Sequence, residues 1–342
     1  MHIHLIGVAG TGMGALAGLL KAAGHRVSGS DTAFYPPMGD ALARWGVETR
    51  QGFRAEHVAD GPDLVVIGNV CRKDNPEARA AIDGGLRYTS FPGLMEELFL
   101  TQRPGFVVAG THGKTTTTAL VSWLLTATGK RPGFLVGGIP KNFGESFALG
   151  AEGAPFVIEG DEYDSAFFEK TPKFWRYRPW AAVLTSVEQD HIDIYPTMDA
   201  YRAAFRGFVE RIPDEGILAG FAGDAEVRAL LDGARSRVRT YALDGDAFGA
   251  AAPHWLAAPV VPRPAARVRP SPARTTSAIF SARWPSRRRE TAWTCTRSSM
   301  PSPRSRVCAG GRTSSPSPAA FTSTTTSRTT RPPCARPWTR SA

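Results

Sequence analysis

The feature that most constrains this fold is a glycine-rich loop between an apolar strand and a threonine-rich helix. Residues 106–108 are apolar, and the segment Gly-Thr-His-Gly-Lys-Thr-Thr-Thr follows at 110–117. Glycines let backbone amides turn toward phosphate oxygens, and the next helix start adds partial positive charge. We predict that Lys114 reaches the β and γ phosphates of a nucleotide and that Thr115 offers its hydroxyl to Mg²⁺. The predicted ATP-binding residues are Gly110, Thr111, His112, Gly113, Lys114, Thr115 and Thr116.

Two acidic or polar segments also follow strands of this unit. Residues 159–164 (EGDEYD) come after the strand at 156–158, and residues 185–191 (TSVEQDH) come after the strand at 182–184. Ligand groups gather at the carboxyl ends of strands in open α/β sheets. Carboxylates there suit Mg²⁺, which prefers oxygen ligands, although a solvated acidic loop explains residues 159–164 equally well. A metal or phosphate role for His191 is favoured over a surface one.

The N-terminal segment carries a second glycine loop. An apolar strand at 2–8 leads into Gly10-Thr11-Gly12-Met13-Gly14, then a helix at 13–23, a strand at 26–30 and Asp31. Read alone, this is a dinucleotide fingerprint and makes an NAD-dependent oxidoreductase the rival interpretation. The motif reports only a pyrophosphate near a helix start, so UDP fits it equally well.

Strands that alternate with helices predict an α/β fold. We expect a Rossmann-like domain at 1–102, a P-loop ATPase-type central domain with a parallel-rich sheet at 103–258, and a basic tail at 259–342. The tail carries the positive charge: residues 247–342 hold 16 arginines and one acid, Glu290, for a net +15, whereas residues 1–246 have a net −5. We therefore do not expect a nucleic-acid partner. No segment resembles a signal peptide or a membrane span, so a cytoplasmic protein is expected.

Taken in order, these motifs resemble the Mur ligases over about residues 1–255. The loop GTHGKTTT has that family's short spacing, with two residues between its glycines. The segments EGDEYDSAFF at 159–168, KTPKF at 170–174 and VGGIPKNF at 136–143 are most similar to the murein-peptide-ligase branch. Asn69, followed by Asn-Pro-Glu at 75–77, fits the same branch.

The resemblance implies an ATP-dependent amide ligase of peptidoglycan recycling. Such an enzyme joins L-alanyl-γ-D-glutamyl-meso-diaminopimelate to UDP-N-acetylmuramate through an acyl phosphate. It implies Lys114, Glu162 and His191 as catalytic residues, with Thr115 and Glu162 on one Mg²⁺ and Glu162 and His191 on a second. The UDP-sugar residues it implies are Gly10, Thr11, Gly12, Met13, Gly14, Asp31 and Asn69. The alternative amine substrate is L-alanine. Ser186 departs from the asparagine usual in the family, which puts the polar contacts near it in doubt.

Mur ligases have a third domain, and its motifs are missing from the tail. Shifting the frame by one base lets residues 325–331 encode Asp-Asp-Phe-Ala-His-His-Pro, residues 275–279 His-Asn-Ile-Arg-Asn, and residues 305–311 Phe-Ala-Gly-Val-Arg-Arg-Arg. Three family-type segments in one frame and in family order favour an out-of-frame tail. We expect such a tail to be disordered or arbitrarily folded, and ligation by this chain to be impaired.

Overall fold

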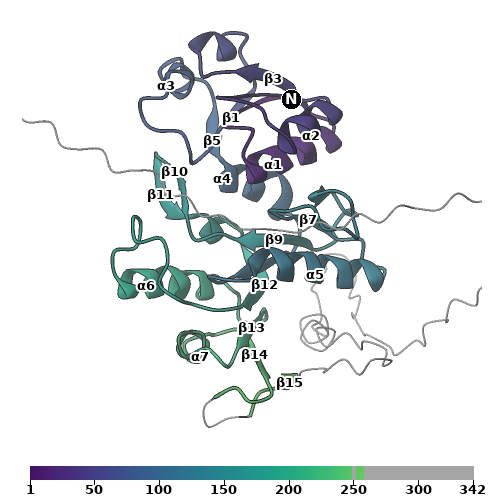
Figure 1. Ribbon diagram of the computed structural model, residues 1–342, viewed down its shortest axis with the longest axis vertical. Coiled ribbons are helices and arrows are strands. Elements are labelled where there is room, and N and C mark those ends of the chain that lie inside the picture. The colour runs from purple at the N-terminus through teal and green to yellow at the C-terminus, as the bar shows by residue number, and fades with distance from the viewer. Residues whose placement is uncertain (249–251, 258–342) are drawn as a thin grey trace, which may run out of the picture. The chain divides into compact units, whose positions relative to one another are not determined.

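The structure, a computed structural model, describes residues 1–248 and 252–257 (Figure 1). The expectations for the tail, including the shifted reading frame, fall outside these residues. Every helix in the described ranges is too short or too polar to cross a bilayer.

The first sheet has five parallel strands in the order β3-β2-β1-β4-β5. Its central strand, β1, is buried after its first residue, as a strand covered on both faces must be. The elements of this part are β1 (His2–Ile6), α1 (Thr11–Ala22), β2 (Arg26–Asp31), α2 (Met38–Arg44), β3 (Glu48–Gln51), η1 (Ala55–Val58), β4 (Leu64–Ile67), α3 (Pro76–Asp83), β5 (Tyr88–Ser90), α4 (Phe91–Met95) and η2 (Glu96–Leu100).

The second sheet has the order β15-β14-β13-β12-β6-β9-β7-β8, and only the β7–β8 pair is antiparallel. Its elements are β6 (Gly105–Ala109), α5 (Lys114–Ala127), β7 (Gly133–Leu135), β8 (Phe147–Ala148), β9 (Phe156–Gly160), η3 (Lys173–Arg176), β12 (Pro179–Leu184), α6 (Met198–Val209), β13 (Ile217–Phe221), α7 (Ala225–Asp232), β14 (Arg237–Leu243) and β15 (Trp255–Ala257). A separate antiparallel hairpin joins β10 (Asp164–Ala166) to β11 (Glu169–Pro172).

The α/β prediction with parallel-rich sheets is confirmed, and the boundaries of the main elements shift by only a few residues. The helix expected at 13–23 begins at Thr11, because Gly10 adopts an extended conformation at its N-cap. The β10–β11 hairpin and the short edge strands were not predicted. They are two to four residues long, too short for a hydrophobic period to show in the sequence.

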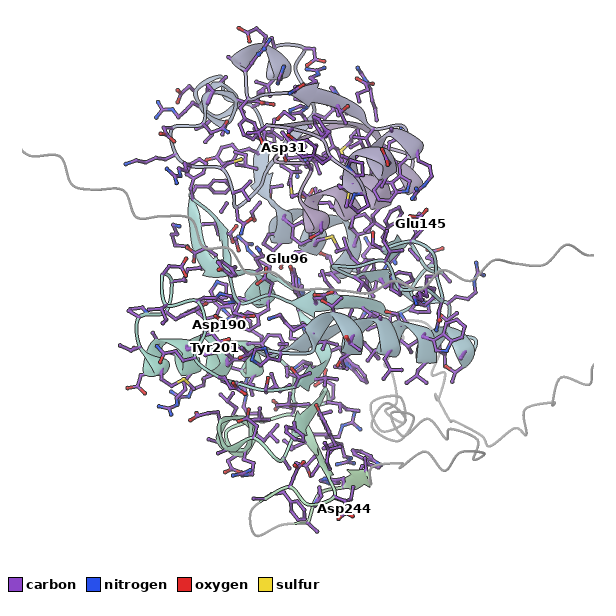
Figure 2. All side chains as sticks on the ribbon, in the orientation of Figure 1. Asp31, Glu96, Glu145, Asp190, Tyr201 and Asp244 are labelled. Carbon is purple, nitrogen blue, oxygen red and sulfur yellow. The ribbon has the colours of Figure 1, made fainter. Side chains whose placement is uncertain are left out.

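Apolar packing and polar pairs connect the two sheets. One buried cluster contains residues of both, and within it the rings of Phe99 and Phe156 lie 5.9 Å apart. Arg176 Nη1 lies 3.2 Å from Glu96 Oε2, and Ser90 Oγ donates to Glu169 Oε2 at 2.7 Å (Figure 2 labels Glu96). A cavity between the sheets is therefore walled by elements that are packed together.

A buried polar chain stabilises the first sheet. His4 on β1 and Glu77 in the first turn of α3 are both fully buried, and His4 Nε2 lies 2.5 Å from Glu77 Oε1. The other imidazole nitrogen, Nδ1, lies 2.7 Å from Ser28 Oγ. Asn75 caps α3 by accepting hydrogen bonds from the amides of Glu77 and Ala78. Buried polar groups are tolerated when each has such partners.

Glu77→Ala should lower the free energy of unfolding by about 3 kcal/mol, because it leaves His4 buried without its carboxylate partner. Glu48→Ala is the matched control: Glu48 pairs with Arg26 at 3.0 Å, but both side chains are about half exposed. An exposed pair contributes under about 1 kcal/mol. Urea unfolding monitored by circular dichroism measures both, and equal losses would contradict the assignment.

Candidate functional site

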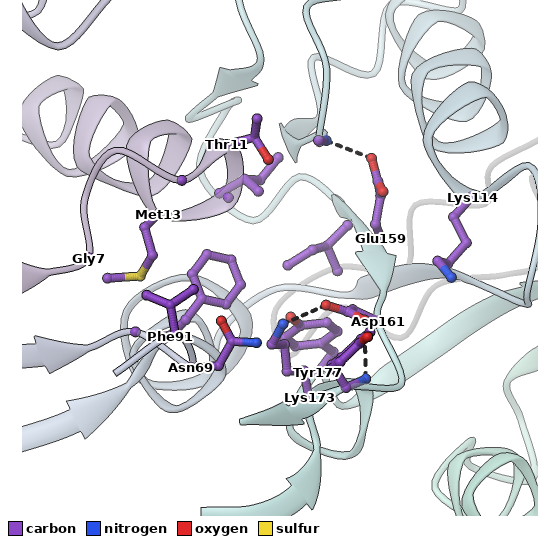
Figure 3. Close-up of a pocket in the computed structure, with 18 of the residues that line it drawn as sticks. Gly7, Thr11, Met13, Asn69, Phe91, Lys114, Glu159, Asp161, Lys173 and Tyr177 are labelled. Carbon is purple, nitrogen blue, oxygen red and sulfur yellow. Dashed lines mark hydrogen bonds and ion pairs between the residues drawn. The ribbon is translucent and has the colours of Figure 1, made fainter. Parts of the chain in front are cut away.

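A cavity of about 460 Å³ lies between the two sheets, at the carboxyl ends of their strands. The first sheet contributes the glycine loop after β1 and residues 68–70 after β4. The second sheet contributes Lys114 at the start of α5, and Glu159 and Asp161 at the end of β9. Figure 3 shows these two groups of side chains facing the same space. The strand ends of both sheets, where ligand groups were expected, therefore share one cavity.

The phosphate loop depends on two glycines with positive φ. Gly110 has φ +137°, and a Cβ there would lie 2.1 Å from Thr185 Oγ1 and 2.8 Å from the Ser186 carbonyl. Gly113 has φ +78° and caps α5. Because the helix begins at Lys114, the backbone N–H groups of residues 114–116 have no acceptor within the helix. They are therefore available to bind an anion. The loop has the geometry of a phosphate cradle.

Lys114 lies folded back over this loop. Its Nζ donates to the Gly110 carbonyl at 2.8 Å and lies 3.0 Å from Glu162 Oε2. A weaker contact at 3.4 Å reaches the Thr111 carbonyl. The ammonium group is thus held directly beside the helix start.

Glu162 is fully buried and is the centre of the site. Besides Lys114, its Oε1 accepts a hydrogen bond from Tyr201 OH at 3.1 Å and lies 3.3 Å from His191 Nε2. Its backbone carbonyl accepts from Tyr195 OH at 2.6 Å. Burial, with Glu162 as a further cause, raises the pKa of both tyrosines, so both hydroxyls stay protonated as donors. The structure therefore brings together Lys114, Glu162 and His191, as the sequence predicted.

His191 has a strained backbone, with φ +56° in a residue other than glycine. The Asp190 carboxylate accepts its amide hydrogen at 2.7 Å, and its ring lies 4.1 Å from that of Tyr163. Such conformations persist only where the surroundings impose them, and they cluster at functional sites. Figure 2 labels Asp190, in the loop after β12, and Tyr201, on α6.

Thr115 contacts a different carboxylate from the one expected. Its Oγ1 donates to Glu159 Oε2 at 3.0 Å, and Glu159 Oε1 accepts the Gly137 amide at 2.6 Å. Glu159 belongs to the acidic segment at 159–164, but it is not among the predicted site residues. Its place at the end of an apolar strand is the signal for Glu159 that the sequence offers; the position of this strand next to β6, which brings Glu159 to Thr115, comes from the structure.

The donor set fits a hard cation that a nucleotide helps to bind. Thr115, Glu159 and Glu162 offer oxygens, and His191 offers a nitrogen beside Glu162. Within the described ranges, no three His, Cys, Asp or Glu side chains form a group that could hold a metal ion by themselves. Mg²⁺ commonly uses one or two carboxylates and takes its other ligands from phosphates and water. The residues present therefore fit Mg²⁺ in the company of a nucleotide.

The other predicted ATP residues surround the loop. Thr111 Oγ1 accepts from the Glu188 amide at 2.9 Å and lies 3.1 Å from Tyr201 OH. His112 is exposed, with Nε2 at 3.7 Å from Glu188 Oε2, and Thr116 is exposed. Ser186 Oγ accepts the His112 amide at 3.1 Å, so a polar contact survives at the position where asparagine was expected.

The predicted UDP-sugar residues divide into two groups. Gly10, Thr11, Gly12, Met13 and Asn69 line the cavity. Gly14 and Asp31 lie outside its lining. Gly14 is buried in α1, where a Cβ would meet the Met38 sulfur at 2.2 Å. Asp31 Oδ2 accepts the Ala9 amide at 2.8 Å, which stabilises the glycine loop.

Comparison with known proteins identifies the family. Residues 2–103 match the model of the Mur ligase family, catalytic domain, and residues 108–257 match that of the Mur ligase middle domain. The structure is similar to the UDP-N-acetylmuramate:L-alanyl-γ-D-glutamyl-meso-diaminopimelate ligase of Neisseria meningitides, with a TM-score of 0.67 and 40% identity, over 70% of this chain and 77% of that chain. The chain belongs to the Mur ligase family.

Two curated relatives illustrate the range of Mur ligases that this chain matches. An Escherichia coli K12 ligase whose name also specifies the diaminopimelate tripeptide is 44% identical over 63% of this chain and 47% of its own length. A UDP-N-acetylmuramate–L-alanine ligase from Roseiflexus is 42% identical over 64% of this chain and 45% of its own. The chain thus spans about half the length of the curated relatives it matches, and the resemblance inferred from its motifs is confirmed.

One further ion pair in this Mur ligase cavity, between Lys173 and Asp161, is not predicted from the sequence. Lys173 Nζ lies 2.5 Å from Asp161 Oδ2, and both residues line the cavity. Burial alone would raise the pKa of Asp161, but the charge and hydrogen bond of Lys173 outweigh it and hold that pKa below its ordinary value of 3.8. The two residues are twelve positions apart in the chain, on either side of the unpredicted hairpin.

Asp161→Asn should lower the free energy of unfolding at pH 7. The difference in this free energy between wild type and variant should disappear in acid. A depressed carboxyl pKa stabilises the fold above the unfolded value, and this contribution is lost as the pH falls through the folded pKa. The gap should therefore narrow progressively below pH 3.8. Urea unfolding at pH 7 and in steps below pH 4 measures it. Asp83→Asn, which removes half of an exposed pair with Arg79, is the control; a gap that does not depend on pH would contradict the ion-pair interpretation.

Proposed function

We propose that this chain is the UDP-sugar-binding and ATP-binding part of an ATP-dependent ligase of peptidoglycan recycling. The ligase would join L-alanyl-γ-D-glutamyl-meso-diaminopimelate to UDP-N-acetylmuramate. One observation carries the proposal: Lys114 and His191 both lie within 3.3 Å of the buried Glu162 carboxylate, and both line a cavity that the glycine loop of the other sheet also lines. One site thus holds groups suited to a triphosphate beside a loop suited to a pyrophosphate.

The reaction would proceed in two steps. A carboxylate oxygen of the sugar acid attacks the γ-phosphorus of ATP, and ADP leaves. The amino group of the peptide then attacks the carbonyl carbon of the acyl phosphate, phosphate leaves, and the nitrogen loses a proton as the amide forms. Lys114 and the amides at the start of α5 would neutralise the charge on the transferring phosphoryl group, which is the main task in such chemistry.

Mg²⁺, when bound, would supply further neutralisation, with Thr115, Glu159, Glu162 and His191 as the side chains that offer it ligands. Tyr201 would fix Glu162 in place, since its hydroxyl bonds both that carboxylate and Thr111. The glycine loop from Gly10 to Gly14 would hold the UDP portion. ATP and nucleotide sugars are both cytoplasmic substrates, so we place the protein in the cytoplasm.

The amine substrate is the less constrained part of this proposal. The tripeptide is favoured because the similar structure and the Escherichia coli relative are both named for it, whereas L-alanine is named for other relatives. ADP release that depends on tripeptide and not on L-alanine, measured with UDP-N-acetylmuramate present, supports the first. The opposite dependence would favour the alternative.

Lys114→Met should weaken the binding of Mg²⁺–ATP by about tenfold or more, because a charge-assisted contact contributes about 1.5–3 kcal/mol. The affinity of the Lys114→Met variant for UDP-N-acetylmuramate should equal that of wild type. Lys170→Met is the control, since Lys170 is exposed and pairs only with Asp164, at 2.8 Å. Isothermal titration of each variant measures both ligands.

Binding of NAD in place of ATP by the wild-type chain would favour the oxidoreductase interpretation. Unchanged ATP affinity in Lys114→Met would contradict the role given to the phosphate loop.

A further inference from the structure

Two lysines line the cavity within the described part of the chain, and only one has spare hydrogen-bond donors. The Lys114 ammonium group has acceptors for all three of its N–H bonds: the carbonyls of Gly110 and Thr111 and the carboxylate of Glu162. Lys173 Nζ has one hydrogen-bond acceptor, Asp161 Oδ2, and otherwise lies 5.8 Å from the centre of the Tyr163 ring. Since a lysine has three N–H donors, two remain for a ligand.

Lys173 is also placed and buried like a binding residue. Its side chain is 12% exposed, and that of Asp161 is 34% exposed. In the view of Figure 3 its ammonium group points toward the part of the cavity that Asn69 lines. The ion pair with Asp161 holds the ammonium group in one orientation. A desolvated ammonium group at a cavity wall binds an anion more strongly than an exposed one.

The position of Lys173 within the cavity suggests which anionic group of the ligand it binds. Asp161 and Glu162 are neighbours in the chain just after β9, and each pairs with one lysine, so both ammonium groups lie near the end of the same strand. The sugar acid carries its pyrophosphate at one end and its lactyl carboxylate at the other. If the glycine loop after β1 takes the pyrophosphate, the carboxylate must lie toward Lys114, where phosphoryl transfer would occur.

We propose that Lys173, in the cavity that Asn69 also lines, forms the subsite for the lactyl carboxylate of the UDP-sugar acid. This inference rests on the proposed function and adds to it a residue that distinguishes sugar acids from neutral sugars. Lys173 holds the carboxylate through charge-assisted hydrogen bonds, and Asp161 orients Lys173. The carboxylate is thereby presented beside Lys114 before the phosphoryl group is transferred.

The test compares two ligands that differ in the carboxylate. UDP-N-acetylmuramate carries the lactyl group, and UDP-N-acetylglucosamine has a hydroxyl in its place. Isothermal titration with the full chain should show that wild type prefers the first by about tenfold or more, as expected for one charge-assisted interaction. Lys173→Met should keep its affinity for UDP-N-acetylglucosamine and lose the preference. Lys173→Arg should retain part of it.

Lys170→Met is again the matched control: Lys170 lies three residues before Lys173, on β11, and pairs with an aspartate, but it does not line this cavity. It should keep the wild-type preference. If Lys173→Met weakens both ligands, the double variant Asp161→Asn/Lys173→Met, which has no unpaired carboxylate, decides the matter. Recovered binding without preference supports the subsite, and an equal loss for both ligands overturns it.

Failure of the subsite and failure of the proposed function give different results. Equal affinity of wild type for the two UDP-sugars, or a preference that survives Lys173→Met, overturns the subsite and leaves the ligase proposal standing. Failure of wild type to bind either UDP-sugar overturns the UDP-sugar role of the cavity, and the subsite with it.

Discussion

The ion pair between Lys114 and Glu162 is the interaction on which the site depends. Glu162 is fully buried, and its carboxylate lies 3.0 Å from the lysine ammonium group. A buried carboxylate without partners would be costly, so the surrounding structure must supply them. Lys114 comes from the start of α5, Tyr201 from α6 and His191 from the loop after β12. This one carboxylate therefore contacts three segments at once, and it adds to the direct hydrogen bonds by which Thr111 joins the phosphate loop to Tyr201 and to the loop after β12.

The two sheets meet at a cavity where both supply groups that can bind anions. Each sheet presents the carboxyl ends of its parallel strands, and each has one glycine turn that opens onto a helix. Helix starts attract anions, so two of them facing one cavity form a site for a ligand with phosphate at both ends. A nucleotide sugar and a nucleoside triphosphate together have that charge distribution. The acidic residues between them, Glu159, Asp161 and Glu162, keep the cavity from being uniformly positive.

The sequence predicts this arrangement where the signal is local. Gly110, Gly113 and Lys114 are contiguous, and their pattern after an apolar strand specifies the loop without knowledge of the fold. The segments that contain Glu162 and His191 could be placed because both follow strands, and parallel strand ends share one edge. The choice of Glu162 within its segment came from the family resemblance. The Asp161–Lys173 pair could not be predicted from the sequence, because it depends on a hairpin whose strands are only three and four residues long. Nor could Thr115 be assigned to Glu159 in advance, because that choice depends on strand order: β9 lies next to β6, and Gly137 lies close enough to hold the carboxylate.

Lys114 and Lys173 differ in the number of hydrogen-bond acceptors around them, and this difference suits them to different roles. Lys114 is surrounded by acceptors that belong to the loop and to Glu162, so it can bind an incoming phosphate only by exchanging one of them. That requirement suits a group whose contacts should strengthen as charge moves during the reaction. Lys173 has a single carboxylate partner and can hold a ligand without giving that partner up, which suits a ground-state anchor. Under the proposed function, selection of the acid and its activation would fall to separate cations. The adjacent carboxylates of Asp161 and Glu162 keep each of these cations paired with its own partner.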